Sequence, residues 1–178
     1  MTYLLVLLAF LCGCAGTNPP TATAIQEPAV KPDFYAGWQV VSIEKDSFMI
    51  PADWNMVPSS NTNKSGITEY FSNKSKLYLI GIHKIPFEGT LLEFSQLVGE
   101  EIDQMPDTKI FDTQITEIDR VTAVEAVLSH DDSIIIGFLF VKHKHAYELF
   151  CTGPLLGASE IIASCQDIAF SFKSGGKI

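Results

Sequence analysis

Alternation of apolar and polar residues dominates the chain after Trp38 and predicts a domain built mainly from β-strands. The pattern indicates strands at residues 39–43, 47–50, 67–71, 76–85, 109–118, 123–130, 133–143 and 146–152. The last four follow one another across short turns, which is typical of antiparallel hairpins. Because residues 76–85 carry apolar side chains at both parities, we expect that strand in the interior of a sheet.

Two segments instead repeat their apolar residues at helical spacing. Thr90 and Glu93 form a capping box, in which each side chain satisfies a free amide group at a helix start. The stripe that follows consists of Leu91, Phe94, Val98, Ile102 and Met105. Pro106 ends this helix. A second helix is expected at about residues 157–170, with an inner stripe of Ala158, Ile162, Cys165 and Ala169.

These elements predict an α+β domain with a single antiparallel β-sheet of about six to seven strands flanked by two main helices. The chain before it has another pattern, since residues 3–12 form an apolar run without charge. Ten residues reach only ~15 Å as a helix, against ~30 Å for the hydrocarbon core of a bilayer. The run therefore suits the apolar region of a signal peptide.

The segment Leu11-Cys12-Gly13-Cys14 closes this apolar run. It resembles the lipobox of bacterial lipoproteins, although Cys12 stands where Ala or Ser is usual. The resemblance implies cleavage after Gly13, a diacylglyceryl thioether on Cys14 and usually an added N-acyl chain. Because two or more acyl chains hold a protein firmly to a bilayer, we expect stable attachment to a membrane. The expected location is the cell envelope, at the outer membrane or the outer face of the cytoplasmic membrane.

The predicted organisation has four parts. Residues 1–13 form the signal peptide, residues 14–36 the lipidated cysteine and a Pro-, Thr- and Ala-rich tether, residues 37–173 the folded domain and residues 174–178 a tail. The formal net charge is -9, and none of it lies before Glu27. A net-acidic domain repels phosphate backbones and anionic headgroups. We therefore expect no nucleic-acid partner, and a membrane grip that comes from lipid.

Four cysteines are present, of which Cys12 leaves with the signal peptide and Cys14 is acylated. Cys151 and Cys165 remain, and a pair in an oxidising compartment favours one disulfide. The predicted second helix would turn Cys165 toward the sheet that carries Cys151. Two free buried thiols and a redox pair are the alternatives, and the wide spacing, unlike Cys-x-x-Cys, argues against the redox pair.

His143 and His145 are weak candidates for a metal site, because two residues so spaced on an extended strand point to one side. Lys142 and Lys144 interleave them, and structural zinc needs four ligands, so a solvated hairpin end is the alternative. No phosphate-binding glycine loop is present. We expect no enzymatic activity and no cofactor.

A run of acidic residues without one basic residue covers the first helix and its flanks: Glu88, Glu93, Glu100, Glu101, Asp103 and Asp107. Such a run is either a solvated face or a docking site for a basic partner or a cation. Clustered charge steers encounters with a partner, but salt screens it.

Four sequence segments together resemble a known family: FMIPADW at 48–54, TLLEF at 90–94, AYEL at 146–149 and IAFSFK at 168–173. With its elements in this order, the domain resembles the PsbP-like and DcrB-like proteins, which are accessory domains of the cell envelope and the thylakoid lumen. The resemblance covers roughly residues 38–173. It implies an antiparallel sheet flanked by helices and a role in binding or assembly, without shared catalytic residues.

We therefore expect a lipid-anchored envelope domain that supports the assembly or stability of an envelope complex, with an envelope protein as its partner. The alternative is a periplasmic lipoprotein that binds a small ligand or a metal.

Lipidation at Cys14 is directly testable by replacing its sulfur. The Cys14→Ser variant should incorporate no radioactive palmitate, whereas the wild-type chain is labelled, because serine offers no thiol for the thioether. Equal label in the two chains would contradict the assignment.

Overall fold

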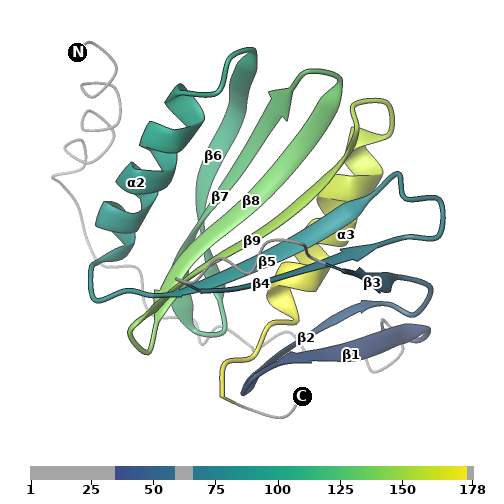
Figure 1. The fold of residues 1–178 in the computed structure, drawn as a ribbon, viewed down its shortest axis with the longest axis horizontal. Coiled ribbons are helices and arrows are strands. Elements are labelled where there is room, and N and C mark those ends of the chain that lie inside the picture. Colours follow the sequence, from purple (N-terminus) through teal and green to yellow (C-terminus); the bar gives the residue numbers. More distant parts are fainter. Residues whose placement is uncertain (1–34, 59–65, 176–178) are drawn as a thin grey trace, which may run out of the picture. The chain divides into compact units, whose positions relative to one another are not determined.

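A long antiparallel sheet with a helix on each face forms the domain (Figure 1). The structure is a computed structural model that describes residues 35–58 and 66–175. The predicted signal peptide, Cys14 and nearly all of the tether lie outside the described residues. The elements are β1 (Trp38–Ile43), β2 (Asp46–Pro51), β3 (Asn55–Val57), β4 (Ile67–Ser72), β5 (Leu79–Pro86), α2 (Leu91–Asp103), β6 (Thr108–Ile118), β7 (Val121–His130), β8 (Ser133–Lys142), β9 (His145–Pro154) and α3 (Ala158–Phe170).

Seven strands form the main sheet in the order β3-β4-β5-β9-β8-β7-β6, and each neighbouring pair is antiparallel. The predicted α+β class, with one sheet of about seven strands and two helices, is confirmed. Strands β1 and β2 differ from the expectation, because they pair with each other in a separate two-stranded sheet. The outer edge of β2 is used by the C-terminal segment: Ser47 N–H donates to the Lys173 carbonyl at 2.9 Å, and Lys173 N–H donates back at 2.8 Å.

Strand β5 lies between β4 and β9, as its two-sided apolar pattern predicts. It begins three residues later than expected, because Asn73 holds the preceding residues in a turn. The Asn73 side-chain oxygen accepts from the backbone of Leu77 and Tyr78, at 3.1 and 3.3 Å. Lys76 takes a left-handed conformation with φ of 58° in the same turn.

Helix α2 begins with the predicted capping box. Glu93 N–H donates to Thr90 Oγ1 at 3.2 Å, and Thr90 N–H donates to Glu93 Oε2 at 2.7 Å. The buried Phe94 packs into a cluster with Leu139 and Ala146, so α2 covers the β8 and β9 side chains of that face. Neither helix of the described residues is long and apolar enough to cross a membrane.

Helix α3 packs on the other face, over the larger part of the core. Alternation along β8 places Ile134, Ile136, Phe138 and Phe140 on this face, and all four are buried. A disulfide joins Cys151 of β9 to Cys165 of α3, as predicted. It ties the helix covalently to the middle of the sheet.

Removing the disulfide should destabilise the domain. The bridge closes residues 14 apart in sequence, which corresponds to ~3 kcal/mol in the chain-entropy model. We expect the double variant Cys151→Ala/Cys165→Ala to unfold roughly 10 °C below the oxidised wild type in thermal unfolding followed by circular dichroism. Reduced wild type is the matched control and should resemble the variant. Equal unfolding temperatures with and without reductant would contradict a structural role for the bridge.

Candidate functional site

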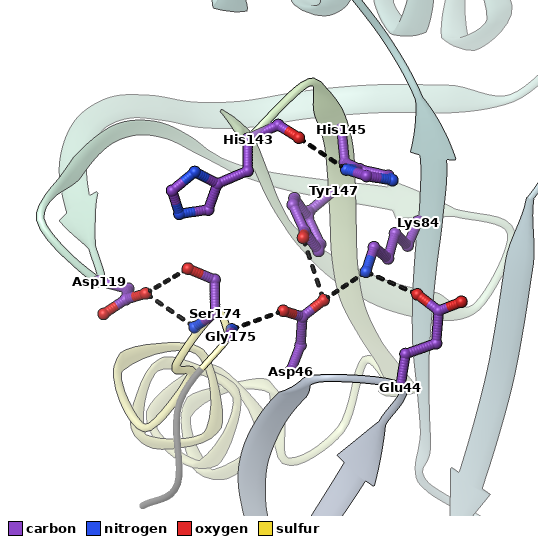
Figure 2. Close-up of polar contacts among 9 residues, drawn as sticks. All are labelled: Glu44, Asp46, Lys84, Asp119, His143, His145, Tyr147, Ser174 and Gly175. Atoms are coloured by element: carbon purple, nitrogen blue, oxygen red, sulfur yellow. Dashed lines mark hydrogen bonds and ion pairs between the residues drawn. The ribbon is translucent and has the colours of Figure 1, made fainter.

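A buried polar cluster joins four distant parts of the chain at one end of the main sheet (Figure 2). Lys84 Nζ of β5 lies 2.7 Å from Asp46 Oδ2 of β2, and the Tyr147 hydroxyl of β9 donates to the same oxygen at 3.0 Å. The other Asp46 oxygen accepts from the Gly175 backbone at 3.0 Å. Asp46, Lys84 and Tyr147 are all buried. The half-exposed rim of the cluster is Glu44, whose carboxylate lies 2.9 Å from Lys84 Nζ.

The strand register explains why these side chains meet. Lys84 and Tyr147 are direct partners in the β5–β9 ladder, so both project onto the α3 face. Lys84 continues the buried series of Ile80 and Ile82 on that face, but with a charged side chain in place of an apolar one. The sequence patterns did not predict this cluster, although a lysine at an inward position of an interior strand indicates a buried acidic partner.

The cluster fixes the protonation of its two donors. Burial alone would lower the pKa of Lys84, but its hydrogen bonds to Asp46 and Glu44 outweigh that effect and raise the pKa above the ordinary lysine value. Burial, together with the negative charge of Asp46, raises the pKa of Tyr147 to about 12. Lys84 therefore stays charged and Tyr147 stays neutral near pH 7, and both act as donors to Asp46. Neither group has the pKa near the working pH that a general base needs.

A second carboxylate, Asp119, holds the same C-terminal segment (Figure 2). Its Oδ2 lies 2.6 Å from Lys142 Nζ and accepts from the Ser174 N–H at 2.8 Å and the Ser174 hydroxyl at 2.9 Å. Burial would raise the pKa of Asp119, but the hydrogen bonds from Lys142 and Ser174 lower it below the ordinary value. Asp46 and Asp119 thus fasten two successive residues of the tail.

The structure places His143 and His145 at the β8–β9 turn, near this cluster but outside it (Figure 2). His143 and Lys144 both have left-handed backbones, with φ of 50° and 60°, so the extended spacing that suggested a metal pair is absent. His145 Nδ1 lies 2.9 Å from the His143 carbonyl oxygen, which occupies one ring nitrogen. Within residues 35–58 and 66–175, no three His, Cys, Asp or Glu side chains are grouped to hold a metal ion.

The acidic side chains on and around α2 divide into two groups. Glu93 is used by the capping box, which lowers its pKa, and Glu88 forms an exposed ion pair with Lys144 at 3.2 Å. Glu100, Glu101 and Asp103 are exposed at the end of the helix. Their exposure fits both a solvated face and a docking site, and an exposed ion pair such as Glu88–Lys144 contributes little to stability.

A cavity of about 200 Å³ opens beside the disulfide. Its lining includes Trp54, Tyr78, Ile161 and both disulfide cysteines, with the Glu160 carboxylate among the polar members. Small-molecule sites usually span about 300–1,000 Å³. This hollow therefore has room for a small group or a single side chain.

No protein-family model matches the sequence, and a search of curated proteins finds no match. Solved structures do match. The solution structure of cyanobacterial PsbP (CyanoP) from Synechocystis has a TM-score of 0.61 at 12% identity, covering 78% of this chain and 93% of that chain. LpqN, involved in cell envelope biogenesis of Mycobacterium tuberculosis, has a TM-score of 0.48 at 11% identity, covering 72% and 82%. A Pseudomonas aeruginosa protein of unknown function has a TM-score of 0.47 at 10% identity, covering 76% and 96%.

The similarity to cyanobacterial PsbP shows that the domain has the PsbP-like fold, as the resemblance predicts. At this level of identity the comparison concerns the fold and carries no site residues across.

The tail anchor at Asp119 should make stability depend on pH in the acid range. Because its pKa is lowered on folding, the carboxylate stabilises the folded state above the unfolded value near 4, and the contribution fades as the pH falls through the folded value. Asp119→Asn should lower the free energy of unfolding by about 2 kcal/mol at pH 7 and by much less at pH 3. Urea unfolding at the two pH values measures this.

Asp53→Asn, at an exposed position, is the matched control and should change little at either pH. A difference between wild type and Asp119→Asn that stays constant from pH 7 to pH 3 would show that the charge of Asp119 does not matter.

Proposed function

We propose that this chain is a lipid-anchored accessory domain of the cell envelope, which acts by binding and supports the assembly or stability of an envelope complex. The observation that carries the proposal is the disulfide between Cys151 and Cys165. Disulfides persist in oxidising compartments such as the bacterial periplasm. Because Cys151 pairs with Cys165, Cys14 is available for lipidation, in agreement with the lipobox-like segment Leu11–Cys14.

A binding role is supported by how the buried titratable groups are used. Asp46 and Asp119 each accept hydrogen bonds from a lysine and from the backbone of the tail. Lys84 and Tyr147 are held in their protonated forms. These groups bind the tail to the end of the sheet, and proton transfer at neutral pH would require breaking those contacts.

The predicted tether gives the domain reach. A stretch of about 22 residues extends to at most ~70 Å, and a flexible coil of that length averages nearer ~25 Å. The anchored domain can thus search for a membrane-bound partner within a small volume, which raises the effective concentration of each for the other. This arrangement favours a partner in the same membrane.

Binding of a small ligand is the second candidate, and the cavity beside Trp54 and Tyr78 is the observation that favours it. Ser164 lies in its lining on α3, where a larger side chain would fill the space. A ligand of that cavity would be small and mainly apolar.

Crosslinking in intact cells separates the two candidates. After treatment with a membrane-permeable crosslinker, affinity purification of the wild-type chain should recover the same envelope protein in every replicate. Cys14→Ser, expressed at equal level and secreted without its anchor, should recover much less of it, because the local concentration is lost. In cells without the chain, the partner's complex should run as smaller species on native gels.

An unchanged complex in cells without the chain would contradict the accessory role. If cells carrying Ser164→Phe show the same defect as cells without the chain, whereas cells carrying Cys14→Ser show none, the ligand-binding candidate is favoured instead.

A further inference from the structure

Strand β6 is an exposed edge of unusual length. It ends the strand order of the main sheet and pairs with β7, and no second strand partner lies along it in the described part of the chain (Figure 1). It spans 11 residues, whereas β3 at the other end of the sheet spans 3. Sheet edges present unpaired backbone groups, and soluble proteins usually shorten or cover them. The short β3 edge follows that rule, whereas the β6 edge is long and is interrupted by one bulge, between Ile110 and Asp112.

Three apolar side chains of this edge are exposed. The exposed fractions of Ile110, Phe111 and Ile115 are 54%, 60% and 70%. Ile115 lies opposite Val124, which packs in the cluster beneath α2, and Ile110 lies opposite the buried Leu128. The exposed residues therefore continue the apolar face on which α2 sits, beyond the last covered strand. Exposed apolar side chains that continue a buried apolar face indicate a contact surface.

The strand is complementary to itself when two copies run antiparallel about a two-fold axis at Thr113. In this register Phe111 of each copy faces Ile115 of the other, and Asp112 faces Gln114. Phe111 is the extra residue of the bulge between Ile110 and Asp112 and has no partner in β7. Alternation counted back from Ile115 and Thr113 places its side chain on their face. The register thus places two aromatic–aliphatic pairs on the face that α2 occupies.

Charge selects the same register. Lys109 lies near one end of β6 and Glu117 near the other, so antiparallel pairing brings opposite charges together at both ends. Moving the axis by one residue toward the N-terminus sets Asp112 against Asp112. Moving it by one toward the C-terminus sets Phe111 against Glu117. The Thr113 N–H is bonded at 2.9 Å to the adjacent Asp112 carboxylate, a local bond that a partner carbonyl would replace.

We propose that β6 is a homodimerisation edge, at which a second copy of this chain adds its own β6 antiparallel to form one continuous sheet. The contact is isologous, since the same strand is used by both copies. This inference goes beyond the proposed accessory function and does not depend on it.

A cysteine on the two-fold axis tests the geometry in the full chain in its own membrane. Residues opposite each other in an antiparallel pair have Cα atoms about 5 Å apart, which suits a disulfide. Thr113→Cys should therefore give a covalent dimer on a non-reducing gel. Thr116→Cys is the matched control: its two copies would lie about 20 Å apart and should stay monomeric. Two differently tagged copies of the chain, co-expressed, identify the species.

Ile115→Lys in the Thr113→Cys background should reduce the covalent dimer at least tenfold, because it sets a charge against Phe111. Since Ile115 is largely exposed, this variant should unfold at the wild-type temperature, which excludes misfolding as the cause. A monomeric Thr113→Cys chain, equal dimer from Thr116→Cys, or a mixed disulfide with a different protein would each overturn the proposal.

Discussion

The ion pair between Asp46 and Lys84 is the contact on which the arrangement of the domain depends. It joins the two-stranded sheet to the main sheet, and the same carboxylate binds Tyr147 of β9 and the backbone of Gly175. A buried ion pair is not in itself a large source of stability, because desolvation offsets most of the attraction. Removing one partner is costly, however, since the other charge is then buried alone. The pair therefore acts mainly by specifying how four parts of the chain meet.

The packing around the pair strengthens this specification. The Tyr147 ring stacks on Phe140 with centroids 4.8 Å apart, and Phe172, which follows α3, packs edge to face on both rings. Asp119 and the disulfide hold the tail and α3 at two further points. The α3 face is thus fixed by polar, aromatic and covalent contacts. The exposed apolar residues of β6 extend the opposite face, on which α2 packs. The α3 face is therefore closed by internal contacts, whereas the α2 face has apolar side chains free for an external contact.

Local patterns predicted the elements well. The capping box at Thr90 and Glu93, the interior position of β5 and the facing of Cys165 toward Cys151 all follow from spacing that the neighbouring residues determine. The separation of β1 and β2 from the main sheet could not be predicted, because it is a tertiary arrangement in which Lys173, more than a hundred residues away, bonds to the edge of β2. The polar cluster was missed for the same reason: Asp46 and Lys84 have meaning only once the register brings them together. The geometry of His143 and His145 could not be predicted from strand alternation, because His143 and Lys144 adopt left-handed turn conformations.

The proposed accessory role depends on attachment of the disulfide-tied domain to a membrane through lipid on Cys14. The most direct measurement is the intact mass of the chain extracted from membranes with detergent. The expected mass is that of a polypeptide that begins at Cys14, plus a diacylglyceryl group and an N-acyl chain. A chain that retains residues 1–13, or a Cys14 that carries no lipid, would contradict it.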